Sequence, residues 1–234
     1  LGGAYKDHFL LGCKGNIRAF KMVADGAGFK REGDHVPIQG LGWQVLTSTF
    51  GPDGRLFFTL WKPRGNRSQL WALQGKKETT EMVEVKGFLA KGFSSYKVDQ
   101  LLSLLGHADR RIRLESQFEL ANRKEEKALR SKAIDARSDL LPRLHALWGL
   151  GQLKARDRDL LKLLCQDKDA EIRAQTVRWA GDLGFDPDNL VPGLLRDPSA
   201  RVRSMAGIAC GKLKSKGALE PLSNLIVGAG NKDT

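Results

Sequence analysis

The chain has 234 residues, of which 41% are hydrophobic and 28% charged, and its net charge is +12. This composition is typical of a globular protein and excludes an intrinsically disordered one, and no apolar run approaches the roughly 20 residues of a membrane-spanning helix. Its three cysteines form no Cys-x-x-Cys or Cys-x-x-Cys-His motif, so the sequence predicts no disulfide framework, zinc ribbon or covalently attached haem.

The excess of basic residues is spread along the chain. Residues 1–90 carry a net charge of +5 (13 basic, 8 acidic), and residues 91–234 carry +7 (26 basic, 19 acidic). The densest basic run is short, Lys212-Leu213-Lys214-Ser215-Lys216. A generally basic, solvated surface explains this distribution more simply than a dedicated stripe for nucleic acid.

The first part of the chain has the patterns of β-strands. Apolar residues 9–13, the turn-forming Lys14-Gly15-Asn16 and the alternating residues 17–22 predict two strands, which end at the Gly-rich segment 24–28. Segments rich in β-branched and aromatic residues predict three more strands, at 45–50, 55–61 and 68–73.

Turn chemistry separates these last three strands, at Gly51-Pro52-Asp53-Gly54 and at residues 63–67. Three strands joined by tight turns predict an antiparallel meander, the unit of a propeller blade. A single blade leaves unpaired edges, so partner blades are implied. We therefore assign residues 1–74 to the end of a β-propeller, its last one or two blades. Residues 75–97, of which 75–84 are polar and charged, are assigned to a linker.

From residue 98 onward the sequence repeats with a period of 30 residues. The aligned units share an arginine column, which consists of Arg113, Arg143, Arg173 and Arg203. Four residues before each arginine stands a preferred helix N-cap residue: Asp109, Asp139, Asp169 and Ser199. Four coinciding units predict a stack of helical hairpins, because one hairpin cannot bury its apolar stripe alone. Leu219 begins a fifth unit, which is cut short at Thr234.

Each arginine of the column has two expected roles. It can reach back to the N-cap carboxylate of its own helix, or bridge to the aspartate of the next repeat as an internal ladder. If the column is exposed, it is instead the candidate binding ladder of the protein. The late glycines Gly151, Gly181 and Gly211 are expected to let the chain leave each helix, and Trp148 and Trp179 to fill the hairpin core.

The period and the Asp-x-x-(Ile/Val)-Arg start resemble HEAT and phycobilisome-lyase-type HEAT-like repeats. Together with residues 15–29, 50–61 and 87–113, the chain resembles large bacterial proteins best known from planctomycetes, in which a propeller related to glucose/sorbosone dehydrogenases precedes HEAT repeats and often a c-type cytochrome domain. The fold expected is β plus α, with about 4.5 HEAT-like hairpins in an α-solenoid at 98–234. The resemblance implies a periplasmic or cell-envelope location and haem c only downstream of Thr234.

No constellation in the sequence predicts catalysis. The four histidines lack metal-ligand spacing, and Gly-x-Ser-x-Gly and Gly-x-Gly-x-x-Gly are absent. Where the resembled family carries acidic residues, this chain has Thr47, Thr49 and Leu60. We therefore expect no catalytic, metal or cofactor site, and a non-catalytic scaffold that binds a protein partner or neighbouring domains of a larger sugar- or alcohol-oxidising protein. The alternatives are a basic HEAT module that binds nucleic acid, and part of a sugar dehydrogenase whose active site is completed upstream.

Overall fold

The computed structural model describes residues 8–61, 68–75 and 78–229. Their contacts separate two compact units, one of residues up to Lys91 except the turn 26–28, the other mainly of residues from Gly92 onward. This division falls inside the segment 75–97 that the sequence assigns to a linker. It also follows the change from strand patterns to the 30-residue repeat.

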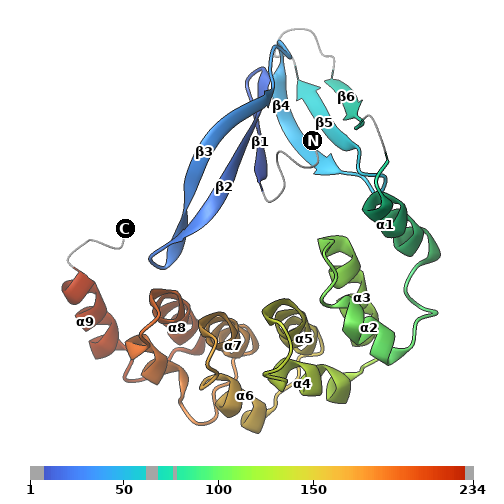
Figure 1. The fold of residues 1–234 in the computed structure, drawn as a ribbon. Coiled ribbons are helices and arrows are strands. Elements are labelled where there is room, and N and C mark those ends of the chain that lie inside the picture. Colours follow the sequence, from blue (N-terminus) through green and yellow to red (C-terminus); the bar gives the residue numbers. More distant parts are fainter. Residues whose placement is uncertain (1–7, 62–67, 76–77, 230–234) are drawn as a thin grey trace. The chain divides into compact units, whose positions relative to one another are not determined.

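The first unit contains two three-stranded antiparallel sheets (Figure 1). The first sheet consists of β1 (Phe9–Cys13), β2 (Asn16–Asp25) and β3 (Gly28–Ile38), in that order. The second sheet consists of β4 (Gln44–Phe50), β5 (Leu56–Trp61) and β6 (Ser68–Leu73). The meander predicted at 45–73 is therefore confirmed, whereas the turn predicted at 63–67 lies outside the described residues. A closed propeller stays a prediction.

Both sheets contribute to one small core. Ile17 of β2, Val45 of β4 and Phe58 of β5 are buried together. The approach of β1 to β4 requires a glycine, because a Cβ on Gly12 would lie 2.5 Å from Cγ1 of Val45. The outer strand β6 has all six of its residues exposed, so the core ends at β5.

Two elements of this unit differ from the sequence-based prediction. β3 continues the chain after the turn at Gly26, although its residues show neither alternation nor an apolar run. Helix α1 (Thr80–Lys91) occupies much of the predicted linker. The hydroxyl of Thr79 accepts a hydrogen bond from the amide of Met82 at its start, and the Met82 side chain packs on Gly54. This contact with a distant turn cannot be inferred from the sequence of the helix alone.

The second unit is a stack of helical hairpins in two layers (Figure 1). The second helices of the hairpins are α3 (Arg110–Asn122), α5 (Leu140–Gln152), α7 (Ala170–Leu183) and α8 (Ala200–Leu213). The first helices are α2 (Val98–Leu104), α4 (Glu126–Ile134), α6 (Arg158–Leu164) and the 3-10 helix η1 (Val191–Arg196). α9 (Leu219–Ala229) follows as the first helix of a fifth unit. The hairpin count agrees with the predicted 4.5, and the second helices begin 30 residues apart.

The late glycines do not have the role expected for them. Gly151, Gly181 and Gly211 lie inside the second helices. The left-handed residues that end these helices come three positions later, at Lys124, Lys154, Gly184 and Lys214. Gly181 is instead a contact between repeats, because a Cβ there would lie 2.9 Å from the Cα and Cβ of Ala209 in α8.

We predict opposite effects for two glycines of this column. Gly211→Ala places its methyl group in open space and should raise the free energy of unfolding by up to about 1 kcal/mol through helix propensity. Gly181→Ala forces α7 and α8 apart and should lower it by about 1–3 kcal/mol. Urea unfolding followed by circular dichroism at 222 nm measures both; equal effects of the two changes would refute the close contact.

Candidate interaction surface on the second helices

The arginine column binds the loops that connect the two helices of each hairpin. Arg113, Arg173 and Arg203 each donate from Nη1 to two carbonyl oxygens, five and six residues earlier in the chain. Arg143 differs, since its Nε donates to the carbonyl of Ala133, 3.0 Å away. Three guanidinium groups therefore hold the loop that precedes their own helix, and that of Arg143 holds the end of α4.

Two arginines of the column also bridge to the next repeat. Arg143 forms an ion pair with Asp167, and Arg173 forms one with Asp197, with an Nε–Oδ2 distance of 2.7 Å. Both partners stand 24 residues further along the chain. The Arg143 side chain is only 3% exposed, and that of Asp197 is 5% exposed. These pairs form an inter-repeat ladder that is largely enclosed by protein.

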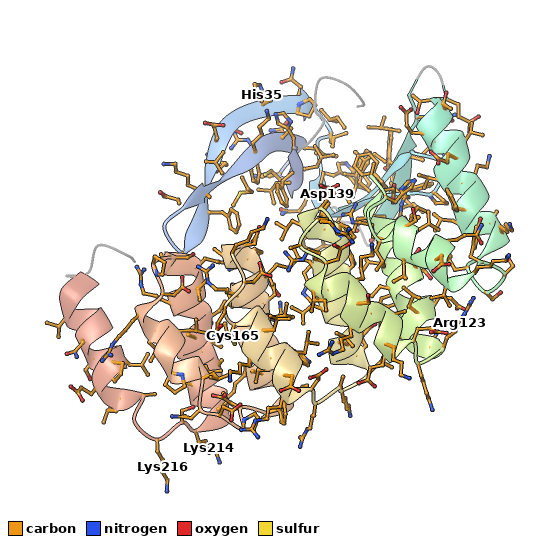
Figure 2. All side chains as sticks on the ribbon, turned by 60° about the horizontal axis from the view of Figure 1, so that its bottom comes forward. His35, Arg123, Asp139, Cys165, Lys214 and Lys216 are labelled. Atoms are coloured by element: carbon orange, nitrogen blue, oxygen red, sulfur yellow. The ribbon has the colours of Figure 1, made fainter. Side chains whose placement is uncertain are left out.

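The aspartates of this ladder stand two residues before the predicted N-caps. Asp167 and Asp197 accept hydrogen bonds from the amides of Asp169 and Ser199, at 2.9 and 2.8 Å. The structure places Asp109, Asp139, Asp169 and Ser199 at the N-cap positions of the four second helices. Only Asp109 and Asp169 accept a capping hydrogen bond through their side chains. Figure 2 shows Asp139 at the start of α5.

The ladder keeps its groups ionised. Hydrogen bonds from Arg173 hold the pKa of Asp197 below its usual value, and the same interaction raises the pKa of Arg173. Burial of Asp167 opposes its ionisation, but the hydrogen bonds from Arg143 and the amide of Asp169 outweigh it, so its pKa is also lowered. The lowered pKa values favour the charged form of both carboxylates.

The first repeat replaces the aspartate by a histidine interaction. The position 24 residues after Arg113 is Arg137, which cannot pair with it. Instead Arg113 donates from Nε to Nε2 of His145, at 3.1 Å, and His145 Nδ1 lies 2.7 Å from Oε1 of Gln117. Because the guanidinium needs an acceptor, the imidazole is neutral and carries its proton on Nδ1. Burial, followed by the charges of Arg113 and Arg110, lowers the pKa of His145 to about 4.

We predict that removing one ladder member is costly. Arg143→Met leaves the Asp167 carboxylate and the Ala133 carbonyl without their partner, and should lower the free energy of unfolding by about 3–5 kcal/mol. Arg158→Met is the matched control, because Arg158 pairs with Asp188 at a solvent-exposed position and such pairs add little. Chemical denaturation compares the two variants, and a similar loss in both would contradict an enclosed ladder.

We predict a pH dependence from His145. Below pH 6.5 the unfolded chain binds a proton at this residue that the folded chain does not, so stability falls until the pH reaches about 4. The loss should approach about 3 kcal/mol, given 1.4 kcal/mol per pKa unit. His145→Gln removes this titration while the carboxylates still titrate, so its stability should decline less between pH 6.5 and 4. Parallel curves for variant and wild type would contradict the prediction.

The second helices also expose apolar residues to solvent. We call this surface the second-helix face and define it by Phe118 of α3, Trp148 of α5 and Ile208 of α8, which occupy the same position of their repeats. Trp148 is 36% exposed, so the expectation that it fills the hairpin core is wrong. Trp179 is only 5% exposed, as expected for a core residue. A shift of one residue turns a side chain by about 100° around a helix, which explains this difference.

Two shallow grooves run between the helices on this face. The groove between α3 and α5 has a volume of about 440 Å³ and is lined by Phe118, Ala121, Asn122, Gln152 and Leu153. The groove between α5 and α7 has a volume of about 370 Å³, and its lining includes Gln152, Trp148 and Trp179. Because Gln152 lines both, the grooves follow one another across three repeats.

Two other residues that could carry chemistry, His107 and Cys165, have structural roles or are buried. His107 accepts a hydrogen bond from the amide of Asp109 through Nδ1, at 2.9 Å, and so stabilises the loop before α3. Cys165 is buried in the helical unit (Figure 2), and burial raises its pKa to about 12. Among the described residues, no three His, Cys, Asp or Glu side chains lie close enough together to hold a metal ion. Within the same residues, no helix is both long and apolar enough to cross a membrane.

Comparison with known proteins supports the repeat assignment. Residues 158–233 match the family of HEAT repeats, a range that begins with α6 and includes the third and fourth hairpins. The C-terminal part of the chain is therefore a HEAT-type helical repeat. A search of curated proteins found no match.

Proposed function

We propose that the helical unit is a non-catalytic scaffold that binds a protein partner through the second-helix face. The observation that carries this proposal is the exposure of Phe118, Trp148 and Ile208 at one repeat position of α3, α5 and α8, next to two grooves. In α7 the same position is the exposed Arg178. Exposed apolar side chains beside polar ones are typical of protein interaction sites. The inter-repeat ladder supports the proposal, because it fixes the spacing of the helices that carry the face.

The arginine column is a poor binding site in comparison. Each of its four members donates to carbonyl oxygens inside its own repeat, and two also pair with buried or half-buried carboxylates. To contact a phosphate of nucleic acid, these guanidinium groups would have to leave the carbonyl and carboxylate groups that they bind. This arrangement therefore favours a protein partner over nucleic acid, although the chain is strongly basic.

We also propose that the chain is part of a larger propeller–HEAT–cytochrome type protein for sugar or alcohol oxidation. The order of an antiparallel β unit followed by a HEAT-type repeat supports this proposal. Upstream propeller blades with a signal peptide and a downstream Cys-x-x-Cys-His motif in the gene would agree with it. A gene that lacks both would contradict it, together with the alternative of a dehydrogenase site completed upstream.

The scaffold proposal predicts which surface changes matter. Phe118→Glu and Ile208→Glu place charges on the second-helix face, while Leu163→Glu places one on an exposed position of the first helix α6. All three should leave stability within about 0.5 kcal/mol of wild type. Proteins cross-linked to the chain in source cells should be lost with the first two variants and retained with the third. Equal retention in all three would refute the proposal.

A further inference from the structure

We propose that the groove between α5 and α7 binds an extended protein segment in which an apolar side chain stands close to a carboxylate. This inference rests on the scaffold function proposed above and specifies its partner. Three observations carry it: the shape of the groove, a buried donor without an acceptor, and the charge at its edge.

The groove has an aromatic and open interior. Its lining combines Leu147, Trp148 and Trp179 with glycine at position 151. A Cβ on Gly151 would lie 3.6 Å from Cδ1 of Trp179, so the missing side chain leaves space beside the indole. The volume of about 370 Å³ suits one bulky apolar side chain better than a whole folded surface.

Trp179 contributes the donor. The residue is 95% buried, since only 5% of it is exposed, and its Nε1 has no hydrogen-bond partner among the described atoms. Indole Nε1 can only donate, and a buried donor without an acceptor is unfavourable. Because Cδ1 is bonded to Nε1, this edge of the ring lies beside Gly151, a residue that also lines the groove. Nε1 itself is covered in the free chain, so a main-chain carbonyl of a bound segment becomes its acceptor once the side chains that line the groove shift.

The edge of the groove is positively charged. Asp182 pairs with Arg178 at 3.5 Å and with Lys212 at 2.5 Å, so that two cations share one carboxylate. The Arg178 side chain is 59% exposed and can turn to a second anion without losing a buried contact. A net charge of +1 at this edge favours a carboxylate on the partner.

The neighbouring groove explains why the ligand is extended. The groove between α3 and α5 is lined by apolar and amide side chains and no charged ones. It meets the first groove at Gln152, whose amide can both donate to and accept from a main chain. A bound segment that crosses both grooves therefore meets the positive charge only beside Arg178.

The test is selection of displayed random peptides of about 12 residues, which span up to roughly 40 Å when extended, on the full chain. Selected peptides should carry Leu, Phe or Met within a few residues of Asp or Glu. Arg178→Glu changes the charge at the edge from +1 to −1, so it should reverse the selected charge to Lys or Arg.

A matched pair of variants tests the groove itself. Gly151→Leu fills the space beside Trp179 and should weaken the selected peptides by about tenfold or more in fluorescence anisotropy. Gly211→Leu is its control, because it stands at the same repeat position with nothing within 4 Å of its Cβ, and it should bind like wild type. Cooperative thermal unfolding of both variants, with a midpoint no lower than that of wild type, shows that folding is intact, since replacing a helical glycine by Leu can itself raise the midpoint.

The outcomes separate this inference from the scaffold function. Peptides that are weakened by Phe118→Glu but keep their charge preference with Arg178→Glu overturn the inference and leave the scaffold function standing. Peptides that bind Phe118→Glu and Gly151→Leu as tightly as wild type overturn both the inference and the scaffold function. Selection that enriches no peptide overturns the inference, while the cross-linking experiment still decides the scaffold function.

Discussion

The enclosed pairing of an arginine in one repeat with an aspartate in the next is the constraint on which the helical unit depends. Arg143–Asp167 and Arg173–Asp197 are each enclosed by protein, where an unpaired charge would be very unfavourable. Such pairs add little to stability compared with apolar packing, but they tolerate few alternative arrangements. The pairs join consecutive hairpins directly, and the carbonyl contacts of the same arginines hold the end of α4 and the loop before α7.

A fixed register determines what the second helices expose. Residues at the same repeat position come to lie in a row, which is how Phe118, Trp148 and Ile208 come to share one face with Arg178. The same register explains the ion pairs between positions 30 residues apart, Glu171–Arg201 and Asp182–Lys212. The second of these leaves Arg178 with only a share of one carboxylate. The internal ladder and the chemistry of the outer surface are therefore two consequences of one repeat spacing.

The β unit is stabilised differently, by a small core shared between two sheets. Ile17, Val45 and Phe58 are buried, whereas the outer strand β6 exposes Leu70 and Trp71. An exposed apolar edge strand is a site at which further β-structure can add, which agrees with the implied partner blades. In this unit the long-range contacts at Gly12 and Gly54 bring β1 against β4 and α1 against a turn.

The sequence by itself determined the features that depend on neighbours along the chain: the strands of the meander, the 30-residue period, the hairpin count and the start of each second helix. It also placed the arginine column, but not its partners, because Asp167 and Asp197 become acceptors only once adjacent hairpins are stacked. The same reason explains Gly181, the exposure of Trp148 and the helix α1. Each depends on the rotation of one element against another, which no local pattern encodes. The candidate grooves were not predicted at all, since only the tertiary structure decides which faces of α3, α5 and α7 meet.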